Sequence, residues 1–196
     1  LYNAALKEVG TKLEILNDEF QHVHQYNPIE HIKTRIKTPE SIVKKLRRYG
    51  HETSIENMVR YVNDIAGIRI SCSFTSDIYL IADMISKQND LTILARRDYM
   101  KNPKKSGYRS YHMLVTTPVF LSDSIIDTKV EIQIRTVAQD FWATLEHKMH
   151  YKFEGDGPDY ITKELRECAR YVAELDTRME ELNNEIQKYG KLSDKK

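Results

Sequence analysis

The chain has 196 residues, of which 40% are hydrophobic and 30% are charged, and its formal net charge is +1. This composition predicts one well-solvated globular domain, with room for a helical extension. A nearly neutral balance argues against a general nucleic-acid-binding protein. No apolar run approaches the roughly 18–20 residues that cross a bilayer, so we expect no membrane partner.

Basic side chains are concentrated in two segments, residues 33–48 and residues 96–109, whereas the last predicted helix is acidic. Two local clusters in a nearly neutral chain favour a cleft for a small polyanion. The two cysteines, Cys72 and Cys168, both fall on apolar stripes. They indicate a reduced, cytoplasmic protein.

Apolar periodicity predicts the elements of the first half of the chain. Thr38 has the character of an N-cap, Pro39 takes the first helical position, and Gly50 stops that helix. In chain order we expect a long amphipathic helix over 2–20, a strand over 29–37, a helix over 39–49, a short helix from 56 and a strand over 68–74.

In the second half, a polar, basic loop at 101–107 precedes two strands, and the remainder is helical. The predicted elements are a helix over 77–87, strands over 91–99, 110–120 and 128–135, a helix over 137–151, a glycine-rich break at 155–158 and a last helix that ends at Tyr189.

The last helix carries an apolar seam. Its apolar residues alternate at spacings of four and three, which is the heptad pattern of a helix that packs on another helix. They are Ile161, Leu165, Cys168, Val172, Leu175, Met179, Leu182, Ile186 and Tyr189. The partner is either a second copy of the chain or its own N-terminal helix.

The strand over 128–135 has two chemically different faces. Glu131, Gln133 and Arg135 point one way, because side chains alternate with period two, while Ile132 and Ile134 point toward a core. The polar face offers a carboxylate for a metal or a proton, and donors for an anionic or nucleotide ligand. A solvated strand face would give the same alternation.

Asp64 precedes the corner at Gly67 that leads into the strand over 68–74. A helix-end cap would explain Asp64 alone. Paired with Glu131, it forms a two-carboxylate magnesium site, since Mg²⁺ uses one or two protein carboxylates and takes its other ligands from water and phosphates. Such a site would polarise a phosphoryl group.

Cations for phosphate surround the first predicted strand and helix. Arginine can hold phosphate oxygens with two hydrogen bonds or stack on a purine. The candidates are Arg35, Lys37, Lys45, Arg47, Arg48 and Arg69. A solvated helix face would explain part of the run over 44–48. The chain has no Gly-x-x-x-x-Gly-Lys-Ser/Thr loop, which excludes a P-loop NTPase.

Lys104 and Tyr108 join a cation to an aromatic ring across a flexible glycine, Gly107. Tyr108 would stack on a base while Lys104 meets phosphate. With twelve tyrosines in the chain, an ordinary core or surface tyrosine is the alternative.

Five motifs occur together in one order, and they resemble those of the RelA/SpoT-type synthetases, specifically the small single-domain alarmone synthetases. The motifs are Arg35-x-Lys37-x-x-x-Ser41, Asp64-Ile65-Ala66-Gly67-Ile68-Arg69, Gly107-Tyr108-Arg109-Ser110-Tyr111-His112, Glu131-Ile132-Gln133-Ile134-Arg135-Thr136 and Phe141-Trp142-Ala143-Thr144-Leu145-Glu146-His147. The segment Asn27-Pro28-Ile29-Glu30-His31 is closer to the RelP branch.

The resemblance implies an α/β (α+β) fold of the nucleotidyltransferase-like type, with a mixed β-sheet flanked by helices. It divides the chain into an N-terminal helix over 1–27, a (p)ppGpp synthetase catalytic domain over 28–153, a C-terminal oligomerisation helix over 154–190 and a disordered tail over 191–196. Small synthetases of this kind are homotetramers, so the resemblance also implies a homotetramer, with no obligatory nucleic acid.

The implied reaction moves the β,γ-pyrophosphate of ATP to the 3′-hydroxyl of GDP or GTP, giving ppGpp or pppGpp and AMP. Asp64 and Glu131 would bind Mg²⁺, and Glu131 would also accept the hydroxyl proton. The chain has no His-Asp dipeptide, which the family's hydrolase domain carries, so synthesis without hydrolysis is implied.

The resemblance also implies roles in nucleotide binding. Arg35 and Arg69 would sandwich adenine, and Tyr108 would stack on guanine. The resemblance assigns Lys37, Ser41, Lys45 and Arg48 to the ATP phosphates. It assigns Lys104, His112, Gln133 and Arg135 to the acceptor nucleotide.

Two alternatives remain open. One keeps the fold but uses another acceptor, such as an adenine nucleotide or the 3′ end of a tRNA. The other is a non-catalytic RNA- or nucleotide-binding module. The pair Asp64 and Glu131 argues against the module, because carboxylates that face phosphates add nothing to anion binding.

Overall fold

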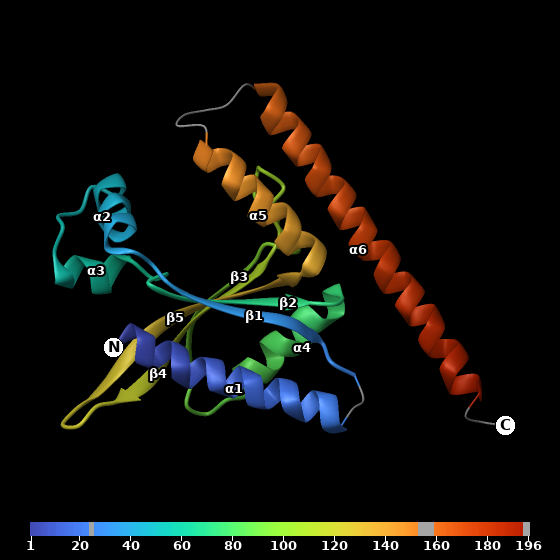
Figure 1. Ribbon diagram of the computed structural model, residues 1–196, viewed down its shortest axis with the longest axis horizontal. Coiled ribbons are helices and arrows are strands. Elements are labelled where there is room, and N and C mark those ends of the chain that lie inside the picture. Colours follow the sequence, from blue (N-terminus) through green and yellow to red (C-terminus); the bar gives the residue numbers. More distant parts are fainter. Residues whose placement is uncertain (24–25, 153–158, 194–196) are drawn as a thin grey trace.

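The computed structural model describes residues 1–23, 26–152 and 159–193. The described residues form five strands and six helices. The strands make one mixed sheet that the helices flank, which confirms the predicted fold class (Figure 1). The elements are α1 (Tyr2–Val23), β1 (Ile29–Ile36), α2 (Pro39–Arg48), α3 (Ile55–Tyr61), β2 (Ala66–Cys72), α4 (Thr75–Ser86), β3 (Thr92–Asp98), β4 (Tyr111–Phe120), β5 (Ile125–Thr136), α5 (Val137–Lys152) and α6 (Asp159–Ser193).

The sheet has the strand order β1-β2-β5-β4-β3. The second and third strands, β2 and β5, are parallel, and the other three pairs of the described strands are antiparallel. Because β2 and β5 lie side by side, the segments around Asp64 and Glu131, which are far apart in the sequence, enter one region of the fold.

One face of the sheet carries the core. Ile68, Ile70, Ile132 and Ile134 are almost completely buried there, and α1 and α4 pack over them. Figure 1 shows α1 and α4 on this side of the sheet, with α2, α3 and α5 on the other. Burying these side chains removes apolar surface from water and anchors the strands that carry the polar face.

Several element boundaries differ from the predicted ones. β2 begins at Ala66 because Ala66 and Gly67 pair with the end of β1. It ends at Cys72, and Phe74 caps α4 by donating its backbone N–H to Asp77 over 3.0 Å. β5 begins earlier than expected, at Ile125, because the ladder with β4 continues to the hairpin turn. The predicted break at 155–158 lies outside the described residues.

Helix α6 packs on its own domain through only part of its length. The indole N–H of Trp142 in α5 donates to the backbone carbonyl of Leu165 over 2.9 Å, and α6 continues past the end of the sheet (Figure 1). The later seam residues stay exposed, with exposed fractions of 52% for Leu182 and 69% for Ile186. α1 lies on the sheet and leaves them uncovered, so the alternative in which α1 covers the seam is wrong.

The helix extends to Ser193, which overlaps the tail predicted over 191–196, and residues 194–196 lie outside the description. Both cysteines are free, with Cys72 buried and Cys168 exposed. Among the helices that the structure describes, none is long and apolar enough to cross a membrane.

Candidate functional site

A row of polar side chains crosses the whole sheet on the face opposite the core. Paired residues on neighbouring strands share a face, so the register places five residues in one line. From β3 to β1 they are Arg97, His112, Gln133, Arg69 and Lys33. This row joins residues that the sequence places in five separate segments, one on each strand.

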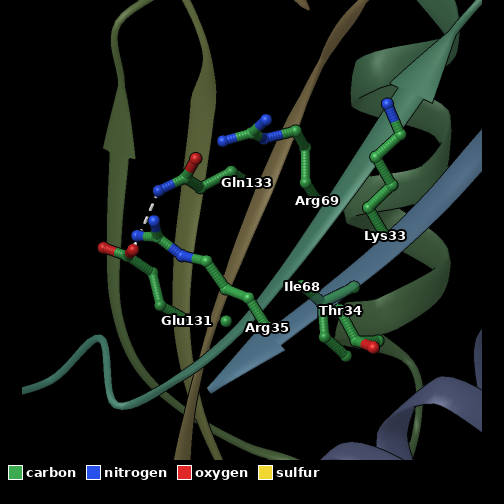
Figure 2. A pocket seen from close by; sticks show the side chains of 8 residues that line it. Lys33, Thr34, Arg35, Ile68, Arg69, Glu131 and Gln133 are labelled. Carbon is green, nitrogen blue, oxygen red and sulfur yellow. Dashed lines mark hydrogen bonds between the residues drawn. The ribbon is translucent and has the colours of Figure 1, made fainter. Parts of the chain in front are cut away.

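The neighbouring row supplies a carboxylate and an arginine. Glu131 pairs with Gly67, and Gly67 pairs with Arg35. A Cβ on Gly67 would lie 3.4 Å from the side chain of Arg35, so the Arg35 side chain passes directly over Gly67. Figure 2 shows the Arg35 side chain extending toward Glu131 and Gln133.

Three cavities adjoin this surface. The first, of about 220 Å³, lies between β1, β2 and β5 (Figure 2). Its lining consists of Lys33, Thr34, Arg35, Gly67, Ile68, Arg69, Glu131 and Gln133. It therefore contains both arginines that the resemblance assigns to adenine.

The second cavity, of about 400 Å³, lies between the sheet, the loop before β4 and α5. Its lining includes all five predicted acceptor residues together with both adenine arginines. The lining residues are Arg35, Arg69, Lys104, Ser106, Tyr108, His112, Gln133, Arg135, Ala143, Thr144, Glu146, His147 and Lys148.

The third cavity, of about 300 Å³, lies on the other side of Glu131, toward α2 and β3. It is lined by Lys45, Tyr49, Tyr61, Asn63, Ala95, Arg97, His112, Met113, Leu114 and Glu131. Glu131 is shared with the first cavity and His112 with the second. Glu131 therefore lies between the first and third cavities, and its neighbours Gln133 and His112 line the second.

Glu131 is partly buried and ionised. Gln133 donates a 2.9 Å hydrogen bond to one carboxylate oxygen, and the imidazole Nδ1 of His112 lies 3.7 Å from the other. The second contact is too long for a hydrogen bond, so its effect is Coulombic. Burial alone would raise the pKa of Glu131, but His112 and Gln133 outweigh burial and lower it.

Asp64 is held by two lysines. Lys37 donates to one of its oxygens over 2.8 Å and Lys45 to the other over 2.7 Å. Burial would raise the pKa of Asp64, but these two charged partners outweigh it and lower the pKa. The negative charge of Asp64 acts in the opposite direction on Glu131 and raises its pKa slightly, so the two carboxylates interact electrostatically.

Lys129 fixes the segment that leads to Asp64. Its ammonium group donates to the backbone carbonyl of Val59 over 3.0 Å and to the side-chain oxygen of Asn63 over 3.1 Å. Lys129 lies on β5, two positions before Glu131. The strand that carries one carboxylate therefore also anchors the loop that carries the other.

The donor set fits a divalent cation that needs few protein ligands. Both carboxylates are ionised. Asp64 lines none of the three cavities, but Lys45, which binds it, lines the third cavity together with Glu131. Within the described residues, no group of three or more His, Cys, Asp or Glu side chains is arranged to hold a metal. A two-carboxylate site that completes its shell with phosphate oxygens and water is the arrangement that Mg²⁺ accepts.

Tyr108 stands in a cluster of cations and rings. Its hydroxyl lies 2.9 Å from Nε2 of His112, and the Lys104 ammonium lies 4.7 Å from its ring centre. Gly107 has a φ of 93°, a conformation that glycine adopts easily, and it sets the direction of the loop before Tyr108. An aromatic ring with adjacent cations suits a purine nucleotide.

Three predicted phosphate residues, Lys37, Ser41 and Arg48, lie outside these cavities. Ser41 accepts a hydrogen bond from the Thr38 hydroxyl at the start of α2, over 3.0 Å. The guanidinium of Arg48 lies 5.3 Å from the Tyr49 ring centre. Both are exposed, and neither lines the three cavities described above. Lys37 contacts the site through Asp64 alone.

The structure adds lining residues that sequence reasoning missed. Arg97 enters the site through its pairing with His112, and its basic segment was the only signal in the sequence. Thr144, His147 and Lys148 share one helical face of α5, at spacings of three and one. Thr144 and His147 belong to the fifth motif, to which the sequence analysis assigned no role, and Lys148 follows it directly.

The fold and the site define a class: α/β proteins in which one polar sheet face carries an ionised carboxylate among basic residues. Residues 34–156 match the family described as "Region found in RelA / SpoT proteins". The chain belongs to the RelA/SpoT family.

Individual relatives are similar over nearly the whole chain. GTP pyrophosphokinase YwaC of Bacillus subtilis is 45% identical over 95% of this chain and 89% of its own length. GTP pyrophosphokinase YjbM of the same organism is 38% identical, over 95% and 87%.

Solved structures agree with this relationship. Small alarmone synthetase 2 from Bacillus subtilis has a TM-score of 0.85 and 44% identity, covering 94% of this chain and 95% of that one. Small alarmone synthetase 1 from Bacillus subtilis, bound to its product pppGpp, has a TM-score of 0.89 and 35% identity, covering 95% and 94%.

Proposed function

We propose that this protein is a GTP pyrophosphokinase that transfers the β,γ-pyrophosphate of ATP to the 3′-hydroxyl of GDP or GTP and releases AMP. The observation that carries the proposal is the position of Glu131, an ionised carboxylate that lines both the first and the third cavity and accepts a hydrogen bond from Gln133, which also lines the second. The names of the relatives support the same activity.

In this proposal the first cavity takes ATP. Arg35 and Arg69 hold the adenine ring between their planar guanidinium groups. Lys37 and Lys45 move from Asp64 to the phosphates, joined by Ser41 and Arg48 when α2 closes on the nucleotide. A solved structure of small alarmone synthetase 1 from Bacillus subtilis bound to AMPCPP supports an ATP-like ligand in this family.

The second cavity takes the acceptor. Tyr108 stacks on guanine, and the remaining contacts come from Lys104, His112, Gln133 and Arg135. The two cavities share Arg35, Arg69 and Gln133, so the acceptor ribose and the ATP phosphates meet beside Glu131. Holding two reactants in this way replaces a bimolecular encounter by a reaction within one complex.

The chemical step forms one bond and breaks one. The acceptor 3′-oxygen attacks the β-phosphorus of ATP, the bond from that phosphorus to the α-phosphate oxygen breaks, and AMP leaves with that oxygen. Glu131 accepts the hydroxyl proton as the new O–P bond forms. Its lowered pKa keeps it ionised and able to do so at neutral pH.

Asp64 and Glu131 would hold Mg²⁺, which would supply positive charge against the oxygens of the transferred pyrophosphate. Hydrogen bonds from Gln133 orient Glu131, and Lys129 orients the Asp64 segment. These contacts fix the two carboxylates before substrate binds.

The exposed seam of α6 supports a homo-oligomer. We propose a tetramer because the resemblance to small alarmone synthetases implies one. Its apolar residues leave a stripe that a second copy of α6 would cover. The nucleotide substrates and the free thiols are consistent with a cytoplasmic protein.

An acceptor screen tests the proposed function. The purified chain is mixed with γ-labelled ATP, Mg²⁺ and one acceptor at a time: GDP, GTP, GMP, an adenine nucleotide or tRNA. Thin-layer chromatography should show label in a new guanine nucleotide with an equal amount of AMP. Transfer to adenine nucleotides or tRNA would support the other acceptors, and no transfer with retained binding would support the non-catalytic module.

A further inference from the structure

Asp140, in the first turn of α5, is surrounded by cations from three strands. Its carboxylate lies 3.0 Å from Nε of Arg135 on β5, 3.5 Å from a terminal nitrogen of Arg69 on β2 and 4.0 Å from the ammonium of Lys33 on β1. Asp140 is 13% exposed and lines none of the three cavities. It stands behind the site.

The two arginines that Asp140 contacts face different parts of the site. Arg69 lines the first cavity and one side of the second. Arg135 lines only the second, and its guanidinium lies 5.8 Å from the Tyr108 ring centre. One carboxylate is therefore connected to the proposed adenine contact and to the ring that would stack on the acceptor base.

These contacts are held by charge more than by hydrogen bonds. The Nε atoms of Arg69 and Arg135 and one oxygen of Asp140 are buried without a well-aligned hydrogen-bond partner, although Arg135 and Asp140 are 3.0 Å apart. Arg135 is 2% exposed, and its burial lowers the pKa of its guanidinium; nearby Arg69 and Arg35 lower the pKa further, whereas Asp140 raises it. In the part of the chain that the structure describes, the ion pairs of both Arg69 and Arg135 end on Asp140.

Removing the negative charge would have two opposing effects. The site would become more positive, which attracts phosphates, but this effect is screened over about 8 Å at physiological salt. The buried guanidinium of Arg135 would also be left beside like charges, and an unpaired buried charge is strongly unfavourable. Because Arg135 cannot lose its proton, its side chain must move, and this loss of position outweighs the screened attraction.

We propose that Asp140 is a positioning residue that holds Arg69 and Arg135 in place for the two nucleotides. The inference rests on the proposed function for the identity of those nucleotides. Its distinctive consequence is that a single substitution outside the cavities weakens the binding of both nucleotides, while the reacting groups around Glu131 stay in place.

The test uses Asp140→Asn, which keeps the shape and removes the charge. Calorimetry at physiological salt measures binding of AMPCPP and GDP separately, and steady-state assays give kcat and the KM of each substrate. We expect both dissociation constants and both KM values to rise on the order of tenfold, as for loss of a charged contact, with a much smaller change in kcat. Asp140→Glu, which keeps the charge on a longer side chain, should lie between the two proteins.

Asp83→Asn is the matched control, because Asp83 is an exposed residue of α4 paired with Lys87. It removes the same charge and should change neither affinity. In an Arg69→Ala background, Asp140→Asn should not weaken AMPCPP binding further, but it should still weaken GDP binding. This pattern separates positioning from a general loss of folded protein.

Unchanged or tighter binding of both nucleotides by Asp140→Asn would overturn the inference, as would weakening of only one. If Asp140→Asn does not fold, Asp140→Glu decides, and normal affinity for both nucleotides in that variant would overturn the inference. Wild-type protein that binds both nucleotides but transfers no pyrophosphate contradicts the proposed function alone. Wild-type protein that binds neither contradicts both.

Discussion

The ammonium group of Lys45 donates a 2.7 Å hydrogen bond to Asp64, and Lys37 binds the other oxygen of the same carboxylate. If these lysines bind ATP as proposed, the phosphates of ATP must compete with Asp64 for them. In the proposed reaction, incoming ATP draws the lysines to its phosphates and frees Asp64 for the magnesium ion that accompanies the nucleotide.

Replacing Asp64 by Asn should lower the rate of AMP formation by on the order of a hundredfold or more, as for loss of one preorganised charged contact. The variant should also need a higher Mg²⁺ concentration for half-maximal rate, because one of two carboxylates is gone. Initial rates over a Mg²⁺ series measure both. A normal rate with a normal Mg²⁺ requirement would contradict the metal role of Asp64.

Replacing Gly107 by Ala should weaken GDP binding by about tenfold and leave AMPCPP binding unchanged. The added Cβ would lie 2.5 Å from the Cβ of Ala169 in α6, and the φ of 93° disfavours alanine. Both effects displace the loop that carries Tyr108. Calorimetry with each nucleotide measures the difference.

A second substitution, Ala169→Gly, removes the overlap but not the backbone strain, so the double variant should recover GDP binding in part. Gly10→Ala in α1 is the control, because nothing lies within 4 Å of its added Cβ. Equal loss of GDP and AMPCPP binding in Gly107→Ala would show that the loop does not act on the acceptor alone.

Asp176, which connects α6 to the end of β5, should make the free energy of unfolding depend on pH. Its carboxylate accepts hydrogen bonds from Thr136 over 2.8 Å and from Gln139 over 2.7 Å. Burial raises the pKa of Asp176 despite these bonds. The folded state therefore holds this proton more tightly than the unfolded chain, whose carboxyl titrates near a pKa of about 3.9.

The contribution of Asp176 to stability is then complete below about pH 3.9 and is lost as the pH rises through its folded pKa. Denaturant unfolding from pH 3 to pH 7, in wild type and Asp176→Asn, measures it. The difference in unfolding free energy should fall with rising pH. Asp64, whose pKa is lowered, should give the opposite slope in Asp64→Asn, and equal slopes for the two would contradict these assignments.

Replacing Leu182 by Glu should dissociate the oligomer. Leu182 lies on the exposed part of the seam of α6, where a charge would be buried between two copies. Sedimentation velocity should show a tetramer for the wild type and a smaller particle for the variant. Glu181→Gln, at an exposed position beside the seam, is the control, and a monomeric wild type at micromolar concentration would contradict the proposed assembly.

Local patterns in the sequence predicted the elements and one face of the site. The alternation of Glu131, Ile132 and Gln133 is a property of a single strand, and the structure confirms it. The order of helices and strands was confirmed for the same reason, because each depends on periodicity within a short window.

Contacts between distant segments could not be obtained in this way. The pairing of Arg97 with His112 depends on the register of β3 against β4, and the contact of Asp140 with Arg69 depends on how α5 crosses the sheet. Neither relationship is encoded in a local pattern. The seam of α6 was predicted in part. Its heptad spacing was evident in the sequence, but only the structure shows which seam residues the rest of the domain leaves exposed.

The central claim is that Glu131 is required for transfer and not for binding. Its most direct test is Glu131→Gln, assayed for AMPCPP and GDP binding by calorimetry and for AMP and alarmone formation from ATP and GDP by chromatography. The account predicts wild-type affinity for both nucleotides, within a fewfold, and no detectable product, whereas wild type forms AMP and alarmone in equal amounts. Product formation by Glu131→Gln at the wild-type rate would contradict it.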